Sequence, residues 1–293
     1  MDSIKKVRAL LETISAGRLA KAAEALGYTP SGMSRMIAAL EKELGLTLLL
    51  RDRSGVAPTA ACRDLLPAFR GLLAADDAAE EAVRQVQGLS AGRLTVGAAY
   101  SRFYPLLSKA IADFSRQHPG VNVEFIEGTS SDLAHAVADH QADFCIISKR
   151  LGDFDWQLLL DDELIALVPR NHPLAAKPYM LAEDFLSEPF ITIYPSQETD
   201  NSRFFAKHGI RPPEGYGTAD VLAAVHMVEA GLGLTLVNGI LVAQIQDVQV
   251  EKKPLLPAAS VPIGVAVTKE ATRSPAAEAF CRAFFARQRV IQA

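Results

Sequence analysis

The residues best suited to chemistry lie between Arg18 and Arg53, and the chemistry they suit is contact with nucleic acid. Ser31, Ser34 and Arg35 fall on one side of a predicted helix. Hydroxyl and guanidinium groups on such a helix can hydrogen-bond to base edges in a major groove, while further arginines contact phosphates. The predicted DNA-contacting residues are Arg18, Thr29, Ser31, Ser34, Arg35, Arg51 and Arg53.

The segment that must position these side chains is predicted to form helices joined by tight turns. A run of helix formers stops at Gly27, a residue suited to a left-handed helix end, and Thr29 with Pro30 can start the next helix. That next helix has an apolar face formed by Met33, Ile37, Leu40 and Leu44. We therefore predict helices over residues 4–16, 19–26 and 29–44, which form a helix-turn-helix unit.

Two short extended pieces are predicted on either side of Ser54 and Gly55, a pair typical of a tight turn. Such a hairpin forms a wing beside the helices and would direct Arg51 and Arg53 toward phosphates. The charge distribution agrees with this prediction. The first 63 residues hold ten basic and six acidic residues, although the whole chain of 293 residues has a formal net charge of −4. A basic head on an acidic body favours DNA binding at one end.

One long helical pattern runs from Thr59 to about Leu89, with Pro67 either bending it or marking its true start. A narrow apolar stripe with charged neighbours favours pairing with a second copy of the chain over burial against its own domain. The stripe consists of Leu65, Phe69, Leu72, Leu73, Ala79, Ala82, Val83 and Val86.

Strands and helices alternate in the rest of the chain, which predicts an α/β domain with a mostly parallel sheet. The expected strands are 94–98, 121–126, 142–147, 158–160, 164–168, 189–194, 234–237 and 263–267, and the expected helices are 104–117, 131–139, 200–208, 220–230 and 275–289.

Polar residues gather where the predicted strands end, the edge at which open parallel sheets bind small molecules. We expect effector contacts from Tyr100, Ser101, Arg102, Thr129, Ser130, Ser148, Lys149, Ser196, Thr218 and Asn238, and Arg150 stands at the same strand end as Ser148 and Lys149. The hypothesis is a small anion, in particular a carboxylate, that is met by helix N-termini and by Arg102 or Lys149.

The order of these features closely resembles that of the LysR-type transcriptional regulators. The residues that carry the resemblance are Ala22, Ala23, Leu26, Leu40, Glu41, Gly45, Arg51, Pro58 and Thr59, followed later by His172, Pro173 and Leu174. Pro30 stands where the family most often has a glutamine that reaches a base, so base selection would rest more on Ser34 and Arg35.

The resemblance implies a winged helix-turn-helix domain over residues 1–60 and a dimerising linker helix over 61–90. A two-lobed effector domain like the periplasmic binding proteins would follow over 91–293, with lobe I at 91–162 and 266–293 and lobe II at 163–265. It implies a sequence-specific DNA-binding transcriptional regulator controlled by a small effector bound between the lobes. The implied partners are double-stranded DNA, the effector, further copies of the chain in a homodimer or homotetramer, and RNA polymerase as a further candidate. The alternative is a two-lobed small-molecule-binding protein without DNA regulation.

Other function classes find little support in the sequence. Gly88-Leu89-Ser90-Ala91-Gly92 matches a nucleophile motif, but a helix precedes it and a strand follows, so we interpret it as a hinge. The histidines and the three cysteines lack metal-ligand or disulfide spacing. We expect no enzyme activity, cofactor or metal. The sequence also lacks a signal peptide and a membrane-length apolar run, so we expect a cytoplasmic protein with no membrane partner.

Overall fold

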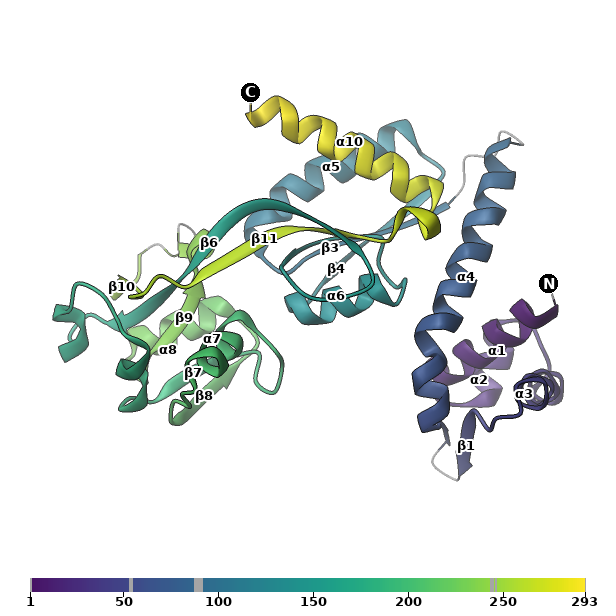
Figure 1. Ribbon diagram of the computed structural model, residues 1–293, viewed down its shortest axis with the longest axis horizontal. Helices are drawn as coiled ribbons and strands as arrows, with labels where there is room; N and C mark the ends of the chain where they lie inside the picture. The colour runs from purple at the N-terminus through teal and green to yellow at the C-terminus, as the bar shows by residue number, and fades with distance from the viewer. Residues whose placement is uncertain (1, 53–54, 87–91, 243–244, 246, 293) are drawn as a thin grey trace.

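The computed structural model of the protein describes residues 2–52, 55–86, 92–242, 245 and 247–292. Figure 1 shows a small helical head at one end, the long helix α4 (Ala60–Val86) beside it, and an elongated α/β domain with two lobes. In the described part of the chain, no helix is long and apolar enough to cross a membrane.

The head consists of α1 (Asp2–Ala16), α2 (Leu19–Ala25) and α3 (Pro30–Leu44), followed by the strands β1 (Leu49–Asp52) and β2 (Gly55–Pro58). The apolar faces of the three helices meet in one core, whose buried members include Val7, Leu10, Ala22, Ala23, Met33, Ile37, Leu40 and Leu48. The prediction that Leu44 shares this buried face is wrong. Leu44 is 43% exposed, because α3 ends there and the chain turns away at Gly45.

The ends of α3 are formed as the sequence predicts. The Thr29 hydroxyl accepts a hydrogen bond from the Gly32 backbone N–H at 3.1 Å, and Pro30 occupies the first position of the helix. Gly45 ends the helix with a left-handed φ of 67°. These local interactions fix where α3 begins and ends, and therefore which of its side chains face outward.

The wing is the antiparallel hairpin of β1 and β2, in which Asp52 pairs with Gly55. Gly55 has a φ of 143°, and a Cβ at this position would lie 2.6 Å from the carbonyl oxygen of Gly17. The next residue, Val56, donates its backbone N–H to the same oxygen at 3.0 Å. Only glycine fits this close approach, which fixes the wing against the turn between α1 and α2.

Helix α4 continues through Pro67 from Ala60, so Pro67 does not mark its start. The predicted pairing stripe is divided in the structure. Its first part, Leu65, Phe69 and Leu73, packs against the core of the head, whereas Leu72 and Val83 are 42% and 54% exposed. The first turns of α4 therefore pack against the head of the same chain, so their apolar residues do not need a second chain to cover them. The hinge predicted around Ser90 lies outside the described residues.

Ion pairs hold α4 on both sides. The Arg8 guanidinium on α1 contacts Asp77 at 2.7 Å and Asp76 at 3.3 Å. Arg70 pairs with Asp139 of the α/β domain. The linker thus contacts both the head and the α/β domain within one chain.

The α/β domain is built on a seven-stranded sheet in the order β10-β6-β11-β5-β3-β4, with β9 paired to β6. Its strands are β3 (Gly92–Ala98), β4 (Val121–Glu127), β5 (Phe144–Ser148), β6 (Asp155–Pro169), β9 (Thr235–Asn238), β10 (Val250–Pro254) and β11 (Ser260–Val267). In this sheet β3 pairs in parallel with β4 and β5, and the other pairings are antiparallel. The prediction of a mostly parallel sheet is therefore wrong.

The strands predicted at 158–160 and 164–168 are one continuous strand, β6. Asp161 and Asp162 interrupt the apolar pattern and suggest a break that does not exist. The buried Asp162 carboxylate instead accepts the Ile240 N–H at 3.0 Å, which allows an acidic residue inside a strand. β6 and β11 lie side by side and pass from one lobe into the other (Figure 1).

The first lobe comprises β3, β4 and β5 with α5 (Tyr104–Gln117), α6 (Ser130–Ala138) and α10 (Pro275–Gln292). The second comprises β9, β10, α7 (Asp200–His208), α8 (Val221–Glu229), α9 (Gly239–Val242) and the parallel pair β7 (Phe190–Ile193) and β8 (Glu214–Thr218). Short 3-10 helices cover Ser101–Phe103, Pro173–Ala176, Ala182–Leu186 and Glu270–Thr272. β8 and β10 have no counterpart among the predicted strands, because β8 is rich in glycine and β10 in charged residues.

Candidate DNA-binding surface and effector pocket

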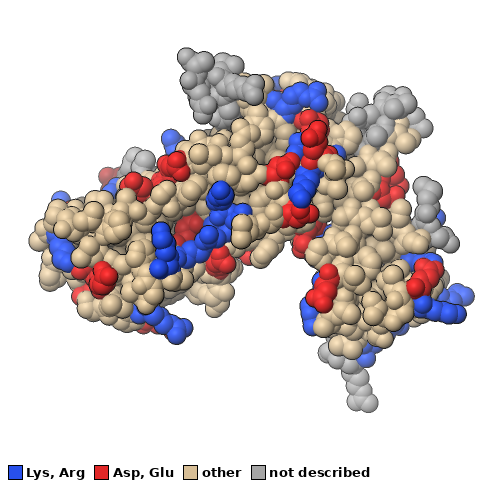
Figure 2. Space-filling view, in the orientation of Figure 1, with Lys and Arg blue, Asp and Glu red and all other residues tan. Residues whose placement is uncertain are grey.

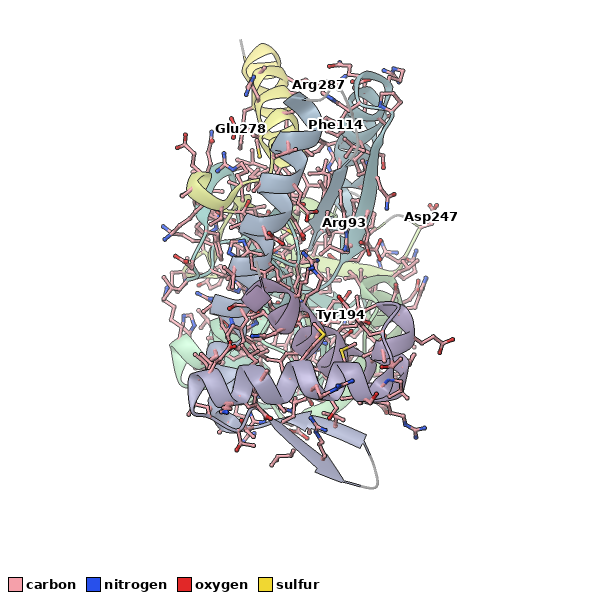
Figure 3. All side chains as sticks on the ribbon, turned by 90° about the vertical axis from the view of Figure 1, so that its right-hand side faces the viewer. Arg93, Phe114, Tyr194, Asp247, Glu278 and Arg287 are labelled. Carbon is pink, nitrogen blue, oxygen red and sulfur yellow. The ribbon has the colours of Figure 1, made fainter. Side chains whose placement is uncertain are left out.

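The outward face of α3 is polar and accessible. Ser31 and Arg35 are exposed, and the Arg35 Nε donates to the Ser31 carbonyl oxygen at 3.4 Å. Across to the wing, Arg51 Nη1 donates to the Ser34 hydroxyl at 2.9 Å. Figure 3 shows α3 lying across the end of the molecule beside the wing. The fold therefore brings the side chains predicted on the helix and on the wing onto one surface.

The remaining predicted DNA-contacting residues are Thr29, Arg18 and Arg53. Thr29 uses its hydroxyl as the cap of α3 and lies 3.3 Å from the Ser31 hydroxyl. Arg18 is exposed at the start of α2, in the segment to which the wing is hydrogen-bonded. Arg53 lies outside the described residues.

A pocket of about 520 Å³, part of it open to solvent, lies between the two lobes of the α/β domain. From the first lobe it is lined by Tyr100, Thr129 and Ser130, and from the second by Asn238, all of which are predicted effector contacts. Arg150 and Asp200 also line it. Arg150 is among the residues expected at the strand ends, and Asp200 is not. The pocket wall is therefore partly as predicted and partly new.

The Asp200 carboxylate is the centre of a hydrogen-bond network in this pocket. It accepts from Tyr100 Oη at 2.5 Å, from the Ser148 hydroxyl at 2.7 Å and from Arg150 Nη2 at 3.1 Å. The Asn238 amide lies 3.4 Å away. Asp200 belongs to α7 in the second lobe, whereas Tyr100, Ser148 and Arg150 belong to the first. One carboxylate therefore joins the two lobes.

Arg150 is held by residues of its own lobe as well as by Asp200 of the second lobe. Its guanidinium donates to Ser131 Oγ at 2.9 Å, to Ser148 Oγ at 2.7 Å and to the Lys149 carbonyl at 3.1 Å, and its side chain is 6% exposed. Burial and the adjacent Asp200 raise the pKa of Tyr100 above its usual range, so its hydroxyl stays protonated and donates. The first lobe thus presents three donors that converge on one carboxylate.

The remaining predicted effector residues have other places. Ser101, Arg102 and Ser196 are exposed and do not line this pocket, and Thr218 accepts the Asp220 N–H at 3.1 Å in a turn. Lys149 lies above the Trp156 ring, 5.3 Å from its centroid. Neither Arg102 nor Lys149 lines this pocket, and the cationic side chain that does is Arg150.

Asp200 could have been found from the sequence as well, because it is the first residue of a helix that the sequence predicts. An acidic residue at a helix start is usually explained by the helix dipole, which hides its contact with another lobe.

The cysteines and histidines do not form a reactive or metal-binding site. Cys62, Cys145 and Cys281 are free and buried, and burial raises the pKa of each thiol, to about 12 for Cys281. A buried thiol with a raised pKa is a poor nucleophile. Within residues that the structure describes, no group of three or more His, Cys, Asp or Glu side chains could hold a metal ion.

Two family models match the chain. One, described as "LysR substrate binding domain", matches residues 87–289, and the other, "Bacterial regulatory helix-turn-helix protein, lysR family", matches residues 4–63. The HTH-type transcriptional regulator CbbR of Sinorhizobium medicae is 29% identical over 191 residues, which are 64% of this chain and 61% of CbbR. The probable HTH-type transcriptional regulator LrrA of Synechococcus elongatus is 27% identical over 280 residues, 95% of each chain.

Solved structures share the fold. A full-length OxyR variant from Pseudomonas aeruginosa has a TM-score of 0.70 at 20% identity and covers 98% of this chain and 94% of its own. The C-terminal domain of a probable LysR family regulator from Rhodococcus sp. RHA1 has a TM-score of 0.54 at 26% identity, covering 67% of this chain and 99% of its own. The expected combination of a helix-turn-helix head with a two-lobed α/β domain is confirmed. This chain belongs to the LysR family.

Proposed function

We propose that this protein is a sequence-specific DNA-binding transcriptional regulator whose activity depends on a small effector bound between its lobes. The observation that carries the proposal is the polar surface of α3 and the wing, with Ser31, Ser34, Arg35 and Arg51 on one face, in the same chain as the pocket around Asp200.

Ser34 and Arg35 would contact base edges, and Arg51 and Arg53 would contact phosphates together with Arg18. In the free protein the Arg51 guanidinium bonds to Ser34, so DNA binding would exchange this contact for one with a phosphate oxygen. Two copies of the chain would pair through the exposed part of α4, where Leu72 and Val83 lie, and place two heads on half-sites about one helical turn or a multiple apart. RNA polymerase is a further proposed partner.

An anionic effector would compete with Asp200. The carboxylate of the effector would accept hydrogen bonds from the three donors of the first lobe, namely Tyr100, Ser148 and Arg150. It would thereby displace the Asp200 side chain that joins the lobes. A ligand shifts the balance between two arrangements only by its different affinity for each. Replacing the Asp200 carboxylate with the carboxylate of a free ligand supplies such a difference in affinity, because it removes the link between the first lobe and α7.

Fluorescence anisotropy tests the DNA-contact assignments, with labelled duplexes carrying either the upstream region of the protein's own gene or a random sequence. We expect Arg35→Ala to weaken binding to the upstream duplex by about 1–3 kcal/mol and to leave binding to the random duplex less affected. Arg51→Ala should weaken both equally and reduce the salt slope by about one.

Arg282→Ala is the matched control, because Arg282 is exposed on α10, away from the head. Equal losses on both duplexes for Arg35→Ala would contradict its assignment to bases. If neither the wild type nor any variant binds the upstream duplex more tightly than the random duplex, the proposed function is contradicted.

A further inference from the structure

The Arg150–Asp200 pair has a second side, which faces a separate groove. The groove encloses about 810 Å³, part of it open to solvent, and lies between the end of β5, the helix α7 and residues 257–262 that lead into β11. Both lobes contribute to it, as they do to the pocket already described. Arg150 and Asp200 line both spaces and separate them.

Helix α7 gives the groove one of its walls. Asp200, Arg203, Phe204, Lys207 and His208 line it, at positions i, i+3, i+4, i+7 and i+8 of the helix. Residues at these intervals share one helical face. The groove is therefore lined by one continuous stripe of α7, which contributes the positive charges of Arg203 and Lys207.

The charges in the groove are unbalanced. Lys149, Arg150, Arg203 and Lys207 line it together with a single acidic residue, Asp200, whose carboxylate is already shared by three donors. The Glu198 carboxylate pairs with Arg203 at 3.2 Å and with Arg150 at 3.8 Å. In the part of the chain that the structure describes, neither Lys149 nor Lys207 forms an ion pair with an acidic side chain.

This excess is local, because the whole chain has a net charge of −4. Figure 2 shows a band of blue side chains across the centre of one face, where the lobes meet. A concave surface lined by one sign of charge concentrates ions of the opposite sign.

We propose that this basic groove is a second ligand site and that it binds the phosphoryl group of a small molecule through Lys149, Arg203 and Lys207. A phosphoryl dianion carries two negative charges and can balance the positive charges of both Lys149 and Lys207. A carboxylate carries one negative charge and can balance only one of them. Lysine and arginine side chains are typical donors to phosphate oxygens, and here they come from the end of β5 and from α7. Leu164, Phe204 and Pro257 supply an apolar wall for the organic part of such a ligand.

His208 completes one end of the groove. Its ring packs on Phe204, with centroids 4.4 Å apart, and its Nδ1 lies 2.8 Å from the Phe204 carbonyl oxygen. A proton on Nδ1 would satisfy that oxygen, which leaves Nε2 as the ring nitrogen available to a ligand. A bound phosphoryl group would contact both lobes and therefore stabilise one arrangement of them.

The chain contains a single tryptophan, Trp156, and its ring lies beneath the Lys149 ammonium. Inorganic pyrophosphate, titrated into the full-length protein, should therefore change Trp156 fluorescence saturably beyond the effect of sodium chloride at equal ionic strength. Isothermal titration calorimetry provides a second readout that does not depend on Trp156. Neither measurement requires DNA, so the result is independent of the proposed regulatory function.

Lys207→Gln keeps the contact between Lys149 and Trp156 and should weaken pyrophosphate binding severalfold. Lys149→Gln combined with Lys207→Gln should weaken it at least about tenfold, as expected for two lost charged contacts. Lys109→Gln combined with Arg282→Gln is the matched control, since it removes two exposed positive charges outside the groove.

Unchanged affinity in the control and weakened affinity in the groove variants would support the site. A response no larger than that of sodium chloride would overturn the proposal. Equal affinity in the wild type and the groove double variant would also overturn it, because the bound anion would then lie elsewhere.

Discussion

Asp200→Ala is the substitution that tests most deeply how the two lobes are joined. It removes the acceptor shared by Tyr100, Ser148 and Arg150, and it leaves a guanidinium that is 6% exposed with the more distant Glu198 carboxylate, 3.8 Å away, as its acidic neighbour. Removing one partner of a buried ion pair typically costs about 3–5 kcal/mol. Since Arg150 keeps three acceptors in its own lobe, we expect a loss near the lower end, about 3 kcal/mol.

Urea unfolding followed by Trp156 fluorescence measures this loss, because the only tryptophan lies on β6 in the α/β domain. Arg203→Ala is the control from the same helix. The Arg203–Glu198 pair is about half exposed on both sides, so its loss should cost less than about 1 kcal/mol.

A double-mutant cycle with Arg150→Met separates the pair from its surroundings. Replacing both charges should restore part of the stability, since the double variant no longer buries a guanidinium that has lost its Asp200 partner. A loss below about 1 kcal/mol for Asp200→Ala, or no coupling between the two positions, would refute this account of the network.

Two further predictions concern other parts of the chain. Burial raises the pKa of Asp143 to about 6, from 3.8. The free energy of unfolding of the wild type should therefore fall by up to about 3 kcal/mol relative to that of Asp143→Asn as the pH rises from 4 to 7. Free energies of unfolding that change in parallel with pH in the two proteins would contradict this. Gly55→Ala should raise the exchange rate of the Val56 amide by about tenfold or more, because the new Cβ meets the Gly17 carbonyl at 2.6 Å. Gly45→Ala, where nothing lies within 4 Å, should leave that amide protected, and equal exchange in both variants would argue against the steric cause.

The head could be predicted almost completely from its sequence because its signals are local. Gly27, Thr29, Pro30 and Gly45 fix the turns and caps within a few residues of themselves. The exposed Leu44 is the exception, since periodicity alone does not say where a helix leaves the core.

The sheet could be predicted less well because its pairing joins distant segments. Alternation of strands and helices correctly predicts parallel pairing for β3, β4 and β5, but it does not reveal that β6 and β11 cross both lobes as antiparallel neighbours. For the same reason, strand ends led to Tyr100, Ser130 and Arg150 but not to Asp200. The contact between Arg150 and Asp200 spans 50 residues and two lobes.

The proposed function is tested most directly by a competition gel shift with the full-length protein and the DNA upstream of its own gene. We predict a shifted complex that survives an excess of random duplex and is lost when the competitor is the unlabelled upstream duplex. If random and upstream DNA compete equally well at physiological salt, the protein does not read sequence, and the proposal of a sequence-specific regulator is contradicted.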